Sequence, residues 1–234
     1  MSTLYIVATP IGNLEDITLR ALRVLKEVDL VLCEDTRVTH KLLDHYEIKK
    51  PLESFHEHSD RRKLERIIKL LESDKNIAFV TDAGTPGISD PGAELIQKIK
   101  ARPLEFSISG LCVEIIPIPG PSALTTLMSV AGIRADRWIF TGFIPQKKGR
   151  ETFFKWLARE KEAVVCYESV HRILKTLDKL ALVLDSKRKI TIGRELTKMY
   201  ENVRTGAAEE LYAYYRTHPE EVHGEFTIVV EGLG

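Results

Sequence analysis

Glycine- and proline-rich segments follow short apolar runs at three places in the first half of this sequence, and their residue types suit the binding of a nucleotide-like molecule. The segments are Thr9–Asn13 (TPIGN), Thr81–Gly87 (TDAGTPG) and Pro119–Ala123 (PGPSA). Glycine lets the backbone approach a ligand closely, proline stiffens the turn, and Ser122 at a helix start places free backbone N–H groups nearby. Each segment alone is compatible with an ordinary turn between a strand and a helix. Three together, at the carboxyl ends of presumed parallel strands, favour a cofactor site at that edge of a sheet.

Acidic and basic side chains gather together at the ends of other apolar runs. The segments are Cys33–Arg37 (CEDTR), Tyr167–Arg172 (YESVHR) and Gly193–Lys198 (GRELTK). In the first of them, Asp35 or Thr36 is expected to cap the helix that follows, because short polar side chains accept the free N–H groups of a first helical turn. Glu34 then remains as a candidate ligand or proton acceptor.

Three basic runs could contact phosphate groups. They are Arg61–Lys63, Lys147–Arg150 and Lys187–Lys189. A run of charges is usually a solvated face, and we interpret Lys187–Lys189 in that way. Gly149 lies inside the second run and favours a close approach of the backbone, so Lys147–Arg150 is the stronger candidate for phosphate binding.

The sequence lacks the fingerprints of several common sites. There is no G-x-G-x-x-G after the first apolar run, and no G-x-x-x-x-G-K-[ST], G-x-S-x-G or H-E-x-x-H anywhere. This argues against dinucleotide, P-loop, serine-hydrolase and zinc-protease sites. His56-Glu57-His58 has the residue types of a metal site, but histidines two residues apart without a nearby cysteine are more often polar loop residues. We therefore predict no metal site.

Short apolar runs alternate with amphipathic stretches in the first half, so the segments above are expected to lie in turns between strands and helices. The predicted strands are Leu4–Ala8, Leu30–Cys33, Ile77–Thr81 and Glu114–Ile118. The predicted helices are Leu19–Val28, Thr36–Tyr46, Arg61–Glu72, Pro91–Lys100 and Ala123–Val130. This alternation predicts an α/β domain with a mostly parallel sheet.

The character of the sequence changes at Arg137–Gly142, where we place a boundary between an N-terminal domain (1–137) and a C-terminal domain (138–234). The predicted helices of the second domain are Glu151–Arg159, Val170–Leu184 and Ala208–Tyr215. Its predicted strands are Ala163–Tyr167, Lys189–Arg194 and Phe226–Val230. Hairpin-like connections among them predict a mixed sheet, so that both domains are of the α/β class.

The composition is that of a globular protein. The chain has 234 residues, of which 34 are basic and 34 acidic, and 44% are hydrophobic. These values exclude a disordered chain, and the formal net charge of zero excludes a uniformly basic protein that coats nucleic acid. Three scattered cysteines argue against a disulfide framework and for a reducing compartment. We find no basic segment of a signal peptide and no apolar run of ~20 residues, so we expect a cytoplasmic protein that does not enter a membrane.

A set of motifs that spans nearly the whole chain resembles one family. The motifs are, in order, VATPIGNLEDIT (Val7–Thr18), CEDTR (Cys33–Arg37), FHEH (Phe55–His58), TDAGTPGISDPG (Thr81–Gly92), IPGPSA (Ile118–Ala123), GFIPQKKGR (Gly142–Arg150), YESVHR (Tyr167–Arg172), GRELTK (Gly193–Lys198) and GEFTIVVEG (Gly224–Gly232). Each motif alone is a weak signal, whereas the ordered set is highly specific. The chain is similar to the small-subunit ribosomal RNA 2′-O-ribose cytidine methyltransferases of the tetrapyrrole-methylase superfamily.

The resemblance implies two α/β domains of the tetrapyrrole-methylase type, a homodimer, and S-adenosylmethionine bound in the cleft between the domains. It also implies the reaction, which is methylation of the ribose 2′-hydroxyl of a decoding-centre cytidine in the 16S rRNA of the 30S ribosomal subunit. By motif position, the cofactor-binding residues are expected to be Thr9, Pro10, Gly12, Asp82, Gly84, Thr85, Ile88, Ser122, Ala123, Tyr167, Arg194 and Glu195.

Methyl transfer to a hydroxyl group needs alignment of its oxygen with the methyl group and a neighbouring group that takes the hydroxyl proton. From residue type and location, the candidates for this proton acceptor are Glu34, Asp35, His56 and Glu57. The resemblance does not choose among them. Arg37 would orient the carboxylates or contact a phosphate. The residues expected to steer RNA phosphates are Lys147, Lys148 and Arg150.

Two other functions are compatible with parts of this pattern. The first keeps the fold and the cofactor but methylates a tetrapyrrole or another small molecule. The second is a non-catalytic module that binds RNA or the ribosome. The basic segment Gly142–Arg150 favours RNA over a small molecule, and the intact cofactor loops favour catalysis. One segment departs from the family pattern, because Ala101–Leu111 lengthens a connection and predicts an inserted loop or hairpin.

Overall fold

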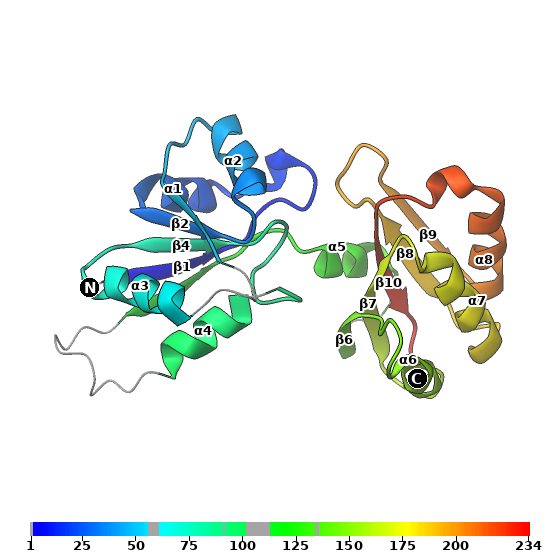
Figure 1. Ribbon diagram of the computed structural model, residues 1–234. Coiled ribbons are helices and arrows are strands. Elements are labelled where there is room, and N and C mark those ends of the chain that lie inside the picture. Colours follow the sequence, from blue (N-terminus) through cyan, green and yellow to red (C-terminus); the bar gives the residue numbers. More distant parts are fainter. Residues whose placement is uncertain (1, 56–60, 91, 102–112, 134–135) are drawn as a thin grey trace. The chain divides into compact units, whose positions relative to one another are not determined.

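The computed structural model describes residues 2–55, 61–90, 92–101, 113–133 and 136–234, and the chain divides into two compact units (Figure 1). Unit 1 is Met1–Ser122 and unit 2 is Ala123–Gly234. The predicted inserted segment Ala101–Leu111 lies outside the described residues except for Ala101. The sequence places the boundary later, at Arg137–Gly142. The difference arises because helix α5 (Ala123–Val130) packs against strands of the second sheet.

Unit 1 is built around a five-stranded parallel sheet. Its strands are β1 (Thr3–Val7), β2 (Leu30–Cys33), β3 (Leu52–Ser54), β4 (Ile77–Val80) and β5 (Glu114–Ile118). The strand order is β3-β2-β4-β1-β5, and every neighbouring pair is parallel, which confirms the predicted parallel sheet. Because β1 lies between β4 and β5, the turns that follow these three strands leave the sheet at neighbouring points of one edge.

Helices cover both faces of this sheet. They are α1 (Leu19–Glu27), α2 (Thr36–His45), α3 (Arg61–Glu72) and α4 (Gly92–Lys100), and a short 3-10 helix, η1, spans Leu14–Asp16. Val7 and Val31 pack with α1 and α2 on one face, whereas Leu4 and Leu32 pack with α3 and α4 on the other. Side chains alternate along a strand, so a sheet that is covered on both faces needs unbroken apolar runs. Those runs are what made these strands predictable.

Local signals start two of these helices. The Thr18 hydroxyl accepts a hydrogen bond from the N–H of Ala21 (3.0 Å) at the start of α1. The Asp35 carboxylate accepts one from the N–H of Arg37 (2.8 Å) at the start of α2. The sequence left the cap of α2 open between Asp35 and Thr36, and the structure selects Asp35.

Unit 2 contains the predicted mixed sheet. Its strands are β6 (Trp138–Phe143), β7 (Ala163–Ser169), β8 (Ile190–Arg194), β9 (Asn202–Gly206) and β10 (Glu225–Val230). The order is β6-β7-β10-β8-β9; β6 and β7 are parallel, and the other pairs are antiparallel. The remaining helices are α6 (Arg150–Leu157), α7 (Ile173–Val183), α8 (Ala208–Thr217) and the 3-10 helix η3 (Pro219–Glu221).

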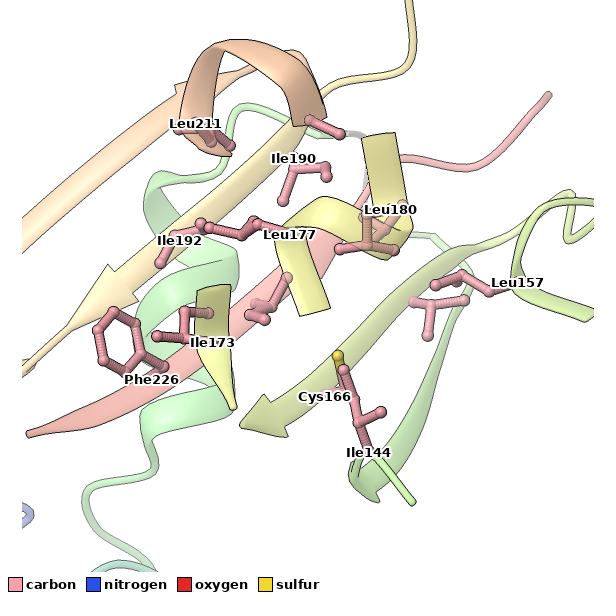
Figure 2. Close-up of a cluster of buried hydrophobic side chains, with 14 of the residues drawn as sticks. Ile144, Leu157, Cys166, Ile173, Leu177, Leu180, Ile190, Ile192, Leu211 and Phe226 are labelled. Carbon is pink, nitrogen blue, oxygen red and sulfur yellow. The ribbon is translucent and has the colours of Figure 1, made fainter. Parts of the chain in front are cut away.

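The core of unit 2 lies between its sheet and helices α6, α7 and α8. Figure 2 shows Leu177 and Leu180 of α7 near strand residues such as Cys166 and Ile190. Helix α5 packs against β8 and β10. Gly193 is needed there, because a Cβ at this position would lie 2.9 Å from Leu127 Cδ1 of α5.

Three strands were not predicted from the sequence, and all three are edge strands. They are β3, β6 and β9. An edge strand can carry fewer buried side chains, so β3 and β9 lack the apolar run by which the edge strand β5 was predicted. In β9, for example, the burial of successive residues alternates between partly exposed and exposed up to Gly206. β6 begins with an apolar run but lies across the segment that the sequence analysis assigned to the domain boundary.

None of the helices described here is long and apolar enough to cross a membrane.

Arg188 corrects the interpretation of the basic run Lys187–Lys189 as a solvated face. Its side chain is only 4% exposed, and its guanidinium group donates to the carbonyls of Leu157 (2.7 Å), Glu160 (3.2 Å) and Glu231. One arginine therefore joins the end of α6 and the segment after it to the segment after β10. Lys187 is exposed.

We expect Arg188→Met to lower the free energy of unfolding by about 3 kcal/mol, because three carbonyls lose a charged donor at a place that is at least partly buried. Urea unfolding followed by circular dichroism measures this change. Lys187→Met is the matched control and should change the free energy by less than about 0.5 kcal/mol. Equal stability of the two variants would show that the Arg188 contacts do not hold the unit together.

Candidate functional site

The turns after β1, β4 and β5 are tied together at the carboxyl edge of the sheet of unit 1. The N–H of Thr9 donates to the carbonyl of Gly84 (3.0 Å), and the N–H of Gly84 donates to the carbonyl of Thr9 (3.1 Å). Thr9 Oγ1 donates to the carbonyl of Thr81 (3.1 Å), and Thr85 Oγ1 donates to that of Pro121 (3.0 Å). The three glycine- and proline-rich segments therefore meet, as the sequence predicts.

Two glycines allow this close approach. Gly84 has a φ of 82°, in the left-handed region, and a Cβ there would lie 3.4 Å from Ile11 Cγ2 and 3.7 Å from the Pro121 oxygen. A Cβ at Gly120 would lie 2.9 Å from the Cβ of Ala8. A side chain would therefore strain the backbone at Gly84, because its φ is left-handed, and would push against Ala8 at Gly120.

The remaining cofactor residues predicted in these segments lie in the same turns. Pro10 and Gly12 follow β1, Asp82 follows β4, Ser122 precedes α5, and Ala123 is the first residue of α5. Pro10 and Ser122 are buried, whereas Gly12 and Asp82 are exposed. Their contacts with a cofactor stay a prediction.

Asp90 organises the turn that follows Gly84, a role that was missed from the sequence. Its carboxylate accepts hydrogen bonds from the N–H groups of Gly87 (2.8 Å), Ile88 (3.3 Å) and Gly92 (2.7 Å). Ile88, a predicted cofactor residue, is held half-buried in this turn. The local signal was present, because aspartate followed two residues later by glycine is typical of a turn in which the side chain binds the backbone.

Three carboxylates, those of Glu34, Asp35 and Asp82, lie at this edge. The surroundings of Asp35 lower its pKa, whereas those of the other two raise theirs. Asp35 pairs with Arg37 (Oδ2 to Nη2, 2.6 Å), and its N–H donates to Asp82 Oδ1 (3.0 Å). Hydrogen bonds from the Arg37 side chain and backbone hold the pKa of the Asp35 carboxyl at about 2. Burial, and then the neighbouring charge of Asp82, raises the pKa of Glu34 above its usual value. Partial loss of surrounding water also raises the pKa of Asp82, although the residue as a whole stays exposed.

The four predicted candidates for the proton acceptor therefore differ in basicity or lie outside the described residues. Asp35 caps a helix and pairs with a guanidinium group, so it is a weak base. Glu34 is half-buried beside Asp82 and is the stronger base of the two. His56 and Glu57 lie outside the described residues. The last described residue before them, Phe55, donates its N–H to the carbonyl of Cys33 (2.7 Å) at the end of β2.

Three further predicted cofactor residues of unit 2 lie on β7 and around the end of β8. Tyr167 is half-buried on β7, Arg194 is buried at the end of β8, and Glu195 follows it with a φ of 50°. The Glu195 carboxylate accepts hydrogen bonds from the N–H of Glu225 (2.9 Å) and from Lys198 Nζ (3.0 Å). Burial favours a raised pKa for Glu195, but these hydrogen bonds outweigh it and hold the pKa below its usual value. Their role towards a cofactor stays a prediction.

The basic segment Gly142–Arg150 divides into an anchored arginine and two exposed lysines. Arg150 donates to Glu168 Oε2 (3.3 Å), to the Pro145 carbonyl (3.1 Å) and to Thr176 Oγ1 (2.7 Å). Lys147 and Lys148 are exposed. The expected phosphate contacts are therefore better supported for the two lysines than for Arg150, whose donors already have protein partners.

Glu168 is the anchor of that arginine, and sequence reasoning gave it no role of its own. It is 1% exposed, and it also binds Arg172 Nη2 (2.6 Å) and the N–H of Ser169 (2.7 Å). A buried carboxylate needs such partners, because an unpaired charge in the interior is costly. In the part of the chain that the structure describes, no group of three or more His, Cys, Asp or Glu side chains is placed to hold a metal ion.

Comparison with known proteins gives two kinds of similarity. The sequence signature of the Tetrapyrrole (Corrin/Porphyrin) Methylases matches residues 3–212. A relative from Thermotoga maritima, named Ribosomal RNA small subunit methyltransferase I, is 42% identical over 233 residues, which are 99% of each chain. Relatives of the same name from Halalkalibacterium halodurans and Haemophilus influenzae are 44% and 40% identical over 99% and 98% of this chain, and 76% and 78% of their own lengths.

Solved structures share the fold at much lower identity. The methyltransferase CobJ and the cobalt precorrin-4 methyltransferase CbiF each superpose with a TM-score of 0.68 at 16% identity. They cover 99% and 98% of this chain, and 94% of their own chains. A uroporphyrin-III-C-methyltransferase from Thermus thermophilus gives a TM-score of 0.64 at 18% identity, over 98% of this chain and 94% of its own. These likenesses confirm the predicted fold type.

We expect the Asp35 carboxyl to titrate with a pKa of about 2, and Arg37→Ala to raise that pKa towards the usual ~3.9. A lowered carboxyl pKa stabilises the folded state above the unfolded pKa, and this stability disappears as pH falls through the folded pKa. Between about pH 4 and pH 2 the wild type should therefore lose more stability than Arg37→Ala.

Carboxyl NMR titration and urea unfolding at each pH measure these two effects. Arg23→Ala is the matched control, because Arg23 is an exposed arginine paired with Glu27 on α1 and should leave Asp35 unchanged. A wild-type Asp35 pKa near 4 would contradict the assignment of its partner.

Proposed function

Because the chain belongs to the Tetrapyrrole (Corrin/Porphyrin) Methylases, and among them to the ribosomal RNA small subunit methyltransferases I, we propose that it methylates the ribose 2′-hydroxyl of a decoding-centre cytidine in 16S rRNA. S-adenosylmethionine is the proposed methyl donor, and the small ribosomal subunit carries the proposed substrate. We also propose that the protein acts as a homodimer, which the family resemblance implies.

One observation carries this proposal. The relative from Thermotoga maritima is 42% identical over 99% of both chains, so the two sequences correspond from end to end. The name of that relative gives the substrate class that we propose here. The solved structures share only the fold with this chain, at 16–18% identity, and their tetrapyrrole substrates are not carried over.

The joined turns of unit 1 fit S-adenosylmethionine. Gly84 and Gly120 let the three turns pack closely together, so that their backbone groups lie at one edge of the sheet. The carboxylates of Glu34 and Asp82 lie at the same edge and attract a positively charged ligand. When bound, S-adenosylmethionine supplies an electrophilic methyl group on a positively charged sulfur. The predicted contacts of Thr9, Thr85 and Ile88 would orient it there.

Glu34 is the proposed proton acceptor. A 2′-hydroxyl is a weak acid, so its oxygen becomes a good nucleophile only as a neighbouring base takes the proton. The Glu34 carboxylate would take that proton while the bond from the oxygen to the methyl carbon forms and the bond from that carbon to the donor's sulfur breaks. Its raised pKa makes it a better acceptor than Asp35, whose charge is already satisfied by Arg37. His56 and Glu57 remain alternatives that mutation separates.

Methyl transfer from labelled S-adenosylmethionine to purified small ribosomal subunits that lack the modification tests the function. We expect one 2′-O-methylated cytidine in the decoding region, located by ribose-methyl mapping. Subunits that already carry the modification are the control and should accept no methyl group. Failure of transfer by a protein that binds S-adenosylmethionine would overturn the ribosomal substrate.

We expect Glu34→Gln to lower the single-turnover rate by about 10²- to 10⁴-fold, because the hydroxyl proton loses its acceptor. Binding of S-adenosylmethionine, measured by calorimetry, should change little. Asp35→Asn is the matched control: asparagine also caps helices well, so this neighbouring loss of charge should change the rate by less than about 3-fold. If Glu34→Gln keeps the wild-type rate while His56→Ala or Glu57→Gln abolishes it, Glu34 is not the acceptor.

A further inference from the structure

Phe143 is an aromatic residue that is largely exposed to solvent. Phe143 is 56% exposed, and the other phenylalanines that the structure describes are buried or half-buried. It ends β6, an edge strand of the sheet of unit 2. A single exposed ring is common on protein surfaces, so what matters is how this ring is held and what lies beside it.

An irregularity in β6 fixes the direction of Phe143. Phe140 pairs with Val165 and Phe143 pairs with Tyr167, so β6 advances three residues while β7 advances two. Gly142 takes up the extra length with a φ of 65°, in the left-handed region. Bulges of this kind turn a side chain away from its regular direction and are frequent beside functional sites.

Aromatic contacts hold the ring in this place. The Phe143 ring lies 5.4 Å from the Tyr167 ring, tilted by 60°, and the Tyr167 ring lies 5.2 Å from that of Phe140 in an edge-on arrangement. The next residue, Ile144, is buried and donates its N–H to the Tyr167 carbonyl (3.0 Å). Phe143 is therefore supported on one side and pinned at its backbone, while much of its surface stays exposed.

Two exposed lysines follow in the same loop, and the loop is closed by a buried ion pair. Lys147 and Lys148 are exposed. Arg150 closes the loop, because its guanidinium donates to the Pro145 carbonyl (3.1 Å) and to the buried Glu168 (3.3 Å), and its N–H donates to the Lys147 carbonyl (3.3 Å). The charged groups of this loop thus divide into Arg150, which fixes it, and two lysines that face solvent.

We propose that Phe143, Lys147 and Lys148 form a subsite for an unpaired nucleotide of the RNA substrate. A base would stack on the exposed surface of Phe143, and the neighbouring phosphates would bind the two ammonium groups. The combination of a supported aromatic ring and adjacent cations matches the two surfaces of a nucleotide, one flat and apolar and the other anionic. The inference rests on the proposed function, because it assumes an RNA substrate.

Three variants of Phe143 and one control variant test the role of the ring. Phe143→Ala removes the ring, Phe143→Leu keeps apolar surface without an aromatic face, and Phe143→Trp keeps an aromatic face. Leu182→Ala is the matched control, because Leu182 is an apolar side chain of the same unit that is 76% exposed on α7. Circular dichroism and urea unfolding establish that each variant is folded.

The binding assay uses fluorescence anisotropy of a labelled, short, unpaired oligoribonucleotide and filter binding of unmodified small ribosomal subunits. We expect Phe143→Ala and Phe143→Leu to weaken binding about 5- to 150-fold, and Phe143→Trp and Leu182→Ala to change it by less than about 3-fold. The slope of log affinity against log salt concentration should stay the same in Phe143→Ala. In Lys147→Ala and Lys148→Ala the magnitude of this negative slope should fall by about 1 each.

Several results would overturn the inference. Binding by Phe143→Leu that equals the wild type would show that no base stacks on the ring. An equal loss of S-adenosylmethionine affinity in Phe143→Ala would assign the ring to the cofactor. A change of oligomeric state in sedimentation equilibrium would assign it to a contact between protein chains.

The subsite and the proposed function can fail separately. Methyl transfer to the decoding-centre cytidine with unchanged oligoribonucleotide binding by Phe143→Ala keeps the function and removes the subsite. Oligoribonucleotide binding that depends on Phe143, in a protein that does not methylate the subunit, keeps the subsite and removes the function.

Discussion

The pairing of Thr9 with Gly84 is the constraint on which the candidate site depends. Two backbone hydrogen bonds join the turn after β1 to the turn after β4, and they can form only because the strand order places these strands side by side. Thr85 adds the turn after β5 through its bond to Pro121. Backbone geometry therefore assembles the site, and side chains on the joined turns then give it its chemistry. A change that separated β4 from β1 would dismantle the site without altering any of those side chains.

Charged residues that look alike in the sequence differ in their burial and in their partners. Three arginines of unit 2 lie mostly inside the protein, where the planar guanidinium group satisfies several acceptors at once: Arg188 binds three carbonyls, and Arg150 and Arg172 share the buried Glu168. Lysines such as Lys147 and Lys148 remain in solvent. Among the carboxylates, Asp35 is neutralised by Arg37, whereas Glu34 is not matched in this way and keeps a raised pKa. A chain with zero net charge can thus carry a local acidic edge and a local basic loop.

The fold and the proposed substrate are supported by comparisons at different levels of sequence identity. Methyltransferases named for uroporphyrin III and cobalt precorrin-4 share the architecture at 16–18% identity, while relatives named for ribosomal RNA match at about 40% over nearly the whole chain. The architecture positions strand-end turns and does not dictate the acceptor of the methyl group. Substrate choice must then come from features beyond these turns, and the proposed subsite of Phe143, Lys147 and Lys148 is a candidate for such a feature.

The sequence by itself determined the central strands, the helices and the turns that carry the site, because these depend on local patterns: unbroken apolar runs, helical periodicity, and glycine and proline at strand ends. It missed β3 and β9, which contain no buried apolar run, and β6, which lies across the segment assigned to the domain boundary. Only the tertiary structure decided the partners of individual charges. Arg150 and Arg188 look alike in the sequence as members of basic runs, yet their acceptors lie on distant segments. Local spacing cannot reveal such partners, since they are brought together only when the sheet and its helices pack.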